Sequence, residues 1–134
     1  MAATAPTGTL LIVERAHRGG VESQFSDELY FARALHTLGG GLDVLLRGAA
    51  AGYAVVPESP PRPPRFTPHG SLPAADPRRS LHGLIADGAG VWVEERDLRA
   101  LGPRAPGRVL PGVRVAGADT QAPEWGSYHR VWFF

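Results

Sequence analysis

The chain has 134 residues, of which 43% are hydrophobic and 20% are charged, and its formal net charge is +1. These values suit a single soluble globular domain, residues 1–134, with one core. The balanced charge lacks the basic excess of a nucleic-acid-binding protein, and no apolar segment approaches the roughly 20 residues that cross a bilayer. We therefore expect no nucleic-acid partner, no membrane partner and a cytoplasmic location.

Cysteine is absent from the sequence, and all 14 basic residues are arginines. The lack of cysteine excludes disulfides, thiolate metal ligands, thiol nucleophiles and persulfide carriage by this chain. The lack of lysine likewise excludes a Schiff-base mechanism that uses a lysine side chain.

The chain opens with the pattern of a buried strand. Residues 9–13 form a continuous apolar run of strand length, which is typical of a central strand in a parallel sheet, and the run ends at Glu14. Residues 15–22, which include His17 and a pair of glycines, are expected to form a loop at the carboxyl end of this strand. Loops in that position often carry ligand contacts.

A helix and a second strand complete a β-α-β unit. The helix is expected to begin at Ser23 or Ser26, because either side chain can cap it, and to end at the glycines 39–41. Residues 42–46 then supply the second strand, which ends at Arg47.

A proline-rich segment follows, at about residues 57–78. Eight prolines lie between Pro57 and Pro77, and each removes a backbone donor and fixes φ. The segment therefore cannot form a regular helix or a central strand. Two alternatives stay open, namely a flexible surface loop and an ordered lid over a ligand crevice.

The remaining residues predict further helices and strands in alternation. We expect a helix over 79–87, a strand over 91–93 that passes directly into a helical turn ending at Gly102, a strand over 113–116, a short helix capped by Thr120 and a strand over 130–134.

This order predicts an α/β fold, a three-layer domain with a mainly parallel five-stranded sheet, for which a flavodoxin-like arrangement is the simplest. Ligands of such sheets bind beyond the carboxyl ends of the strands. If the first and third strands are neighbours, Glu14 and Glu94 emerge side by side at that edge.

Nearly the whole chain resembles the DsrE/DsrF-like sulfur-relay family (TusBCD and YchN type). The resemblance rests on the order and spacing of six segments, which are residues 10–13, 28–35, 43–48, 88–102, 109–113 and 131–134. It implies the DsrE-like fold and a homo-oligomer, a trimer or hexamer, or an assembly with related subunits.

The resemblance also shows what this chain lacks. In thiol-bearing members the reactive cysteine directly follows the third strand, ahead of the glycine that Gly102 resembles, and this position is Glu94 here. A second cysteine of some relatives corresponds to Asp97. Because both positions are acidic, persulfide transfer is not expected.

Carboxylates at this position suggest acid/base chemistry. Two carboxylates that share a crevice repel each other, so one of them can hold a proton near neutral pH, as a general acid requires. We expect Glu94 to be the catalytic residue, with Glu14 and His17 adjusting its proton affinity. The alternative is that both glutamates are solvated or paired with arginines such as Arg47.

A small-molecule ligand would be held by residues near the same edge. Arg47 can bind an anionic group through a forked hydrogen bond, Tyr53 can line the pocket wall, and Asp97 and Arg96 lie one turn beyond Glu94. The alternative for these residues is sheet-edge packing and surface pairing. No tight metal-ligand spacing occurs, so we expect neither a metal nor another cofactor.

Two functions remain candidates. The first is a small-molecule enzyme that uses carboxylate acid/base chemistry for an elimination, isomerisation, cyclisation or hydrolysis. The second is a non-catalytic partner or scaffold subunit of a sulfur-transfer or biosynthetic complex. A stable homo-oligomer with a closed pocket around Glu94 would favour the enzyme, and a monomer that exposes an apolar face and needs a partner to stay soluble would favour the subunit. The closing aromatic residues, 132–134, are either the core of the last strand or a subunit contact, and their number favours oligomerisation.

Overall fold

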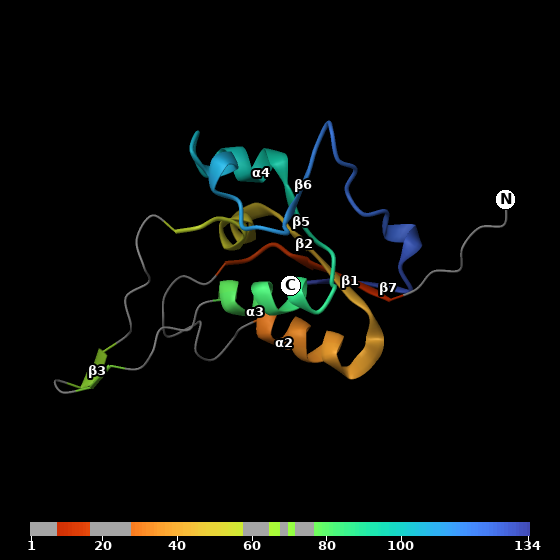
Figure 1. Ribbon diagram of the computed structural model, residues 1–134, viewed down its shortest axis with the longest axis horizontal. Helices are drawn as coiled ribbons and strands as arrows, with labels where there is room; N and C mark the ends of the chain where they lie inside the picture. Colours follow the sequence, from red (N-terminus) through yellow and green to blue (C-terminus); the bar gives the residue numbers. More distant parts are fainter. Residues whose placement is uncertain (1–7, 17–27, 58–64, 68–69, 72–76) are drawn as a thin grey trace, which may run out of the picture.

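The computed structural model of the protein describes residues 8–16, 28–57, 65–67, 70–71 and 77–134. Its centre is a five-stranded sheet in which every pair of neighbouring strands is parallel (Figure 1). The strands, in chain order, are β1 (Thr9–Val13), β2 (Leu42–Leu46), β5 (Val91–Glu94), β6 (Arg114–Ala116) and β7 (Arg130–Phe133). The prediction of an α/β fold with a parallel five-stranded sheet as its middle layer is confirmed.

Helices connect these strands. They are α2 (Glu28–Leu35), η1 (His36–Gly40), η2 (Gly48–Ala54), α3 (Pro77–Ala86), α4 (Glu95–Ala100), η3 (Ala105–Arg108) and η4 (Trp125–Ser127). The predicted last helix is shorter than expected and begins after Glu124, so Thr120 does not cap it. Instead the carbonyl of Thr120 accepts the Gly117 N–H in a turn, because the prolines and glycines nearby favour turns over a helix.

Alternate residues of the strands divide the core between the two faces of the sheet. Leu11, Val44 and Val91 lie on the face that α2 and α3 cover, together with buried residues of η2 and α4. Figure 1 shows α2 and α3 side by side. Leu45 and Trp92 lie on the opposite face, in a smaller cluster with Leu10, Ile12 and Ala116.

The opposite face is crossed by residues 117–129. This crossing follows from the strand order, β6-β5-β2-β1-β7, because β6 and β7 form opposite edges of the sheet and are consecutive along the chain. Tyr128, at the end of the crossing, packs against the smaller cluster. The chain thus places an additional layer, with η4 in it, over this face.

The strand order corrects one prediction. β1 and β5 are not neighbours, because β2 pairs with both of them. Strands β1, β2, β5 and β6 advance across the sheet in chain order, and only β7 returns to the other side of β1. Residue patterns within each strand do not encode this order. As a consequence Arg47, at the end of β2, lies between Glu14 and Glu94.

The described part of the proline-rich segment includes two short strands. β3 (Arg65–Thr67) and β4 (Gly70–Ser71) form an antiparallel pair that is separate from the main sheet. The absence of a central strand within these described ranges agrees with the proline pattern. Much of the segment, like His17, lies outside the described residues, so the lid and the role of His17 stay predictions.

Candidate functional site

Three charged side chains follow three neighbouring strands at the carboxyl end of the sheet. Glu14 comes directly after β1, Arg47 directly after β2, and Glu94 is the last residue of β5. Arg47 donates a hydrogen bond from Nε to Oε1 of Glu14 at 2.8 Å, and its Nη2 contacts the same oxygen. Its Nη1 lies 3.9 Å from Oε1 of Glu94. The guanidinium therefore bridges the two carboxylates that were expected to repel each other.

Glu94 is held more loosely than Glu14. Besides Arg47, its carboxylate faces Arg96, whose Nη2 lies 4.0 Å from Oε2, and the Arg96 side chain is 86% exposed. Both distances exceed a hydrogen bond, so they correspond to charge attraction without a shared proton. Glu94 also occupies the N-cap position of α4 without a side-chain hydrogen bond to that helix. Its side chain is 26% exposed, so a ligand or partner can reach the carboxylate.

Asp97 has a positioning role. Its Oδ2 accepts a hydrogen bond of 2.8 Å from the backbone N–H of Gly48, and Arg96 lies 3.7 Å from its other oxygen. Gly48 has a φ of 58°, which favours glycine, and a Cβ there would lie 3.2 Å from the Glu14 carbonyl. Asp97 therefore fixes the backbone directly after Arg47.

Two aromatic rings complete the surroundings of Arg47. Its Cζ lies 5.9 Å from the ring centre of Trp125 and 5.7 Å from that of Phe133, within range of a cation–π interaction. The two rings pack edge to face, with centres 5.4 Å apart. Trp125 is 46% and Phe133 is 52% exposed. Sequence analysis missed Trp125, because its approach to Arg47 depends on the crossing of residues 117–129.

A second aromatic pair involves Phe134 and a residue of α2. Phe134, the residue after Phe133, has its ring centre 6.1 Å from that of Phe31 on α2, and both side chains are exposed. We call the four residues Trp125, Phe133, Phe134 and Phe31 the aromatic edge. It borders β7, an edge strand whose partner in the described sheet is β1.

Tyr53 is not brought to this cluster. It is 7% exposed and packs in the core on the helix-covered face. The described residues also contain no group of three or more His, Asp or Glu side chains placed to hold a metal ion. The predicted residues that do come together are Glu14, Arg47, Glu94, Arg96 and Asp97.

At the amino end of the sheet, the carboxylate of Asp43 is hydrogen-bonded through both of its oxygens. Oδ1 of Asp43, on β2, accepts the Gly90 N–H at 2.8 Å, and Oδ2 accepts the Tyr128 hydroxyl at 2.7 Å. Burial raises the pKa of Tyr128, and the hydrogen bond and negative charge of Asp43 add to this effect. Asp43 thereby joins β2 to β5 and to the crossing segment.

Among the described residues, two of the cavities have volumes of about 390 and 380 Å³. The first is lined by η2, η3 and the start of α3, and the second lies beside Asp43 and Tyr128. Neither is lined by Glu14, Arg47 or Glu94. The charged cluster at the carboxyl end is therefore part of a surface and not of either cavity.

A comparison with solved structures identifies the fold. The crystal structure of the YchN protein from E. coli matches with a TM-score of 0.67, covering 96% of this chain and 99% of that chain at 20% sequence identity. The chain has a DsrE-like fold. The family models and the curated proteins give no match to the sequence. At this identity the likeness establishes the fold, and function has to be argued from the residues themselves.

The predicted strand-to-helix corner is present in this fold. Glu94 ends β5 and precedes α4, and Arg47, which follows the neighbouring strand, faces its carboxylate. Within the described ranges, none of the helices has the length and apolar character that a membrane crossing needs.

Proposed function

We propose that the protein is a non-catalytic subunit of a DsrE-like assembly. It associates with a second copy of itself through the aromatic edge and the adjoining residues Glu14, Arg47 and Glu94. The observation that carries this proposal is the position of Arg47, which contacts Glu14 and lies within 6 Å of the centres of two exposed rings. The charged cluster thus adjoins the Trp125 and Phe133 rings of the aromatic edge.

The composition of this surface suits a protein interface. Aromatic residues and arginine are enriched in interfaces, and they contribute a large share of the binding energy where water is excluded. All four rings of the aromatic edge are substantially exposed in the single chain. An exposed edge strand such as β7 is a further site of association unless something covers it.

The charges favour a second copy as the partner. Glu14 and Glu94 lie on the same surface as Arg47 and the exposed Arg96, so two copies can place unlike charges opposite each other. Most soluble oligomers are built from identical subunits with closed symmetry. The trimers and hexamers implied by the family resemblance fit the same conclusion.

Sedimentation velocity over a range of protein concentrations tests this proposal. The wild-type chain should sediment as an oligomer, and a double variant, Trp125→Ala with Phe133→Ser, should shift toward the monomer. Leu38→Ser is the matched control, because Leu38 is 83% exposed but lies in η1, before β2, at the amino end of the sheet. This control should keep the wild-type mass.

Two results of this measurement would contradict the proposed association. A wild-type chain that is monomeric at every concentration would overturn the proposal. An oligomer that persists in the double variant would also overturn it, because it would place the interface elsewhere. Circular dichroism and thermal melting of each variant establish that a change in mass does not come from unfolding.

A second candidate function is acid/base catalysis by Glu94. It is favoured by the geometry of that carboxylate, whose two arginine contacts of 3.9 and 4.0 Å leave room for a substrate hydrogen bond. Substrates for elimination, isomerisation, cyclisation and hydrolysis can be screened with the wild-type protein. Glu94→Gln should lower kcat by about 100-fold or more, as loss of a general acid does.

Glu95→Gln is the control for that screen, because Glu95 is the next residue and pairs with Arg99 on the outside of α4. An activity that both variants retain, or that both lose, would rule out Glu94 as the acid or base. No turnover of any substrate class by the wild-type protein would favour the non-catalytic subunit.

A further inference from the structure

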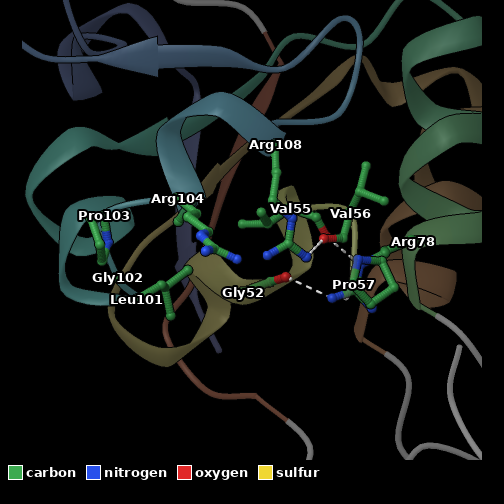
Figure 2. Close-up of a pocket in the computed structure, with 11 residues that line it drawn as sticks. Gly52, Val55, Val56, Pro57, Arg78, Leu101, Gly102, Pro103, Arg104 and Arg108 are labelled. Atoms are coloured by element: carbon green, nitrogen blue, oxygen red, sulfur yellow. Dashed lines mark hydrogen bonds between the residues drawn. The ribbon is translucent and has the colours of Figure 1, made fainter. Parts of the chain in front are cut away.

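Three arginines line the cavity of about 390 Å³ (Figure 2). Arg78 comes from the first turn of α3, Arg104 precedes η3, and Arg108 ends it. The described lining residues include no aspartate or glutamate. This composition differs from the carboxyl end of the sheet, where Arg47 lies between two carboxylates.

The walls of the cavity are joined by backbone hydrogen bonds. Val55 and Val109 form an antiparallel bridge that links the end of η2 to the end of η3. The Val56 N–H donates to the Arg108 carbonyl, and the Leu110 N–H donates to the Ala54 carbonyl, both at 2.8 Å. The cavity is therefore built by two segments that hold each other in place without a ligand.

Two of the arginines are positioned by backbone carbonyls. Arg78 donates to the carbonyl of Val55 at 2.7 Å and to that of Gly52 at 2.8 Å, as the dashed lines in Figure 2 show. Arg108 donates from Nη2 to the carbonyl of Val56. These bonds fix the direction of both side chains.

Arg104 differs from both, because it makes no hydrogen bond or ion pair with the described residues. It follows Gly102 and Pro103, and its side chain is exposed. Figure 2 shows its guanidinium turned toward that of Arg108, into the same space. Like charges that face one another repel, and an anion placed between them reverses the sign of the interaction.

We propose that this cavity binds a small organic anion, whose carboxylate or phosphate group is held by Arg104 and Arg108. A planar guanidinium can donate two parallel hydrogen bonds to either group. Val55, Leu101 and Pro103 supply apolar wall for a short aliphatic part of the same ligand. The volume falls in the range of about 300 to 1,000 Å³ that small-molecule sites occupy.

This site is independent of the proposed interface. Its residues belong to η2, α3 and η3, and η3 leads into β6, the edge of the sheet opposite to β7. A second copy bound at the aromatic edge would therefore leave the cavity open. An experiment on this site does not depend on the outcome of the sedimentation measurements.

Isothermal titration calorimetry with defined anions tests the proposal. Inorganic phosphate and pyrophosphate form the phosphate arm, and succinate and 4-methylpentanoate form the carboxylate arm. At least one arm should give saturable binding with one ligand per chain, and the stronger arm identifies the anionic group. Arg104→Gln should weaken that binding by about 10- to 100-fold, the value expected for a lost charged hydrogen bond.

Arg79→Gln is the control with the same change of charge, because Arg79 is exposed on α3 and does not line the cavity. It should bind the anion as the wild-type chain does. Three results would overturn the proposal, namely no saturable binding by any probe at millimolar concentration, an unchanged affinity in Arg104→Gln, or an equal loss in Arg79→Gln. Thermal melting checks that both variants fold.

Discussion

The two ends of β2 carry opposite charges in contrasting surroundings. Asp43 near its amino end and Arg47 just past its carboxyl end lie on the same face of the sheet, with the buried Leu45 between them. Asp43 accepts two hydrogen bonds of 2.7 and 2.8 Å, one from a backbone N–H and one from a tyrosine. Arg47 is hydrogen-bonded to Glu14, but its approach to Glu94 is 3.9 Å.

This contrast indicates which charges are structural and which can serve function. The donors at Asp43 come from Gly90, directly before β5, and from the crossing segment, so that carboxylate holds three parts of the fold together. Arg47 instead has exposed rings and a loosely held carboxylate beside it. Its interactions can be completed by another molecule, as is usual at the carboxyl ends of parallel strands.

The largest loss of stability is expected for a substitution near the amino end of β2. Asp43→Ala leaves the Gly90 N–H and the Tyr128 hydroxyl without their acceptor, so we expect the free energy of unfolding to fall by about 2–3 kcal/mol. Urea denaturation measures this loss. Asp119→Ala, on the exposed crossing segment, is the control and should change stability by less than about 0.5 kcal/mol. Equal losses in both variants would mean that Asp43 has no special structural role.

At the carboxyl end the effect should be smaller. Arg47→Met removes the cation between Glu14 and Glu94, and we expect the free energy of unfolding to fall by about 1–2 kcal/mol. Adding Glu14→Gln should restore part of the loss, because one of the two facing carboxylates is then neutral. Arg99→Met, which breaks an exposed pair within α4, should cost only about 0.3–0.5 kcal/mol. A loss in Arg47→Met no larger than this control would contradict the bridging role.

The stability of the protein at alkaline pH tests the structural role of Tyr128 at the amino end of β2. In the unfolded chain tyrosine ionises near pH 10, whereas the folded chain keeps Tyr128 protonated to higher pH because its pKa is raised. Above about pH 10 the folded state therefore binds more protons than the unfolded state, so stability should decrease as pH rises. Below pH 10 this contribution is fully present.

Tyr128→Phe should make the stability less dependent on pH above 10, and it should lower stability by about 1 kcal/mol at pH 7 through the lost hydrogen bond. Urea denaturation at pH 7 and over pH 9.5 to 11 measures both quantities. Tyr30→Phe, on the exposed side of α2, should keep the wild-type pH dependence. An unchanged dependence in Tyr128→Phe would show that this hydroxyl is not protected in the folded state.

The smallest effect is expected for Glu94→Gln. The carboxylate lies 3.9 and 4.0 Å from its two arginines, too far for a hydrogen bond to either, so its neutralisation should change stability by less than about 0.5 kcal/mol. Thermal melting of the variant measures the change. A loss of 1 kcal/mol or more would move Glu94 into the same structural class as Asp43 and weaken the case for its use by a ligand or partner.

Strands β1, β2 and β5 could be predicted from the sequence because they are largely buried on both faces. The run at 42–46, apolar except for Asp43, coincides with β2, and the run at 91–93 lacks only Glu94 of β5. Such runs need no tertiary information to be recognised. The neighbours of each strand depend on the direction of every crossover, so the position of β2 between β1 and β5 was not predicted.

The residues of the charged cluster could be predicted from the sequence, but their arrangement could not. Glu14, Arg47 and Glu94 were predicted because each follows an apolar run, a signal that is local in the sequence. Their mutual geometry required the strand order, which replaced two facing carboxylates by a carboxylate–arginine–carboxylate arrangement.

The cavity lined by Arg78, Arg104 and Arg108 could not be predicted from the sequence. Arg78 follows the proline-rich segment, and Arg104 and Arg108 lie in a connection that is rich in proline and glycine. The Val55–Val109 bridge and the hydrogen bonds beside it bring the connection to the end of η2, and Arg78 reaches the same place through the carbonyls of Gly52 and Val55. Clusters of arginine beside turns are a weak indication of such a site until the pairing of the segments is known.

The position of β7 has a consequence for the order of folding. Thr9 pairs with Leu42 on one side and with Arg130 on the other, so the second pairing closes a far longer loop than the first. Long loops cost more entropy and form contacts later. We expect β1, β2 and β5 to assemble first and β7 to dock last. The guanidinium of Arg47 would then meet Glu14 before its aromatic neighbours arrive, and an early intermediate would present the open edge of β1 to other chains.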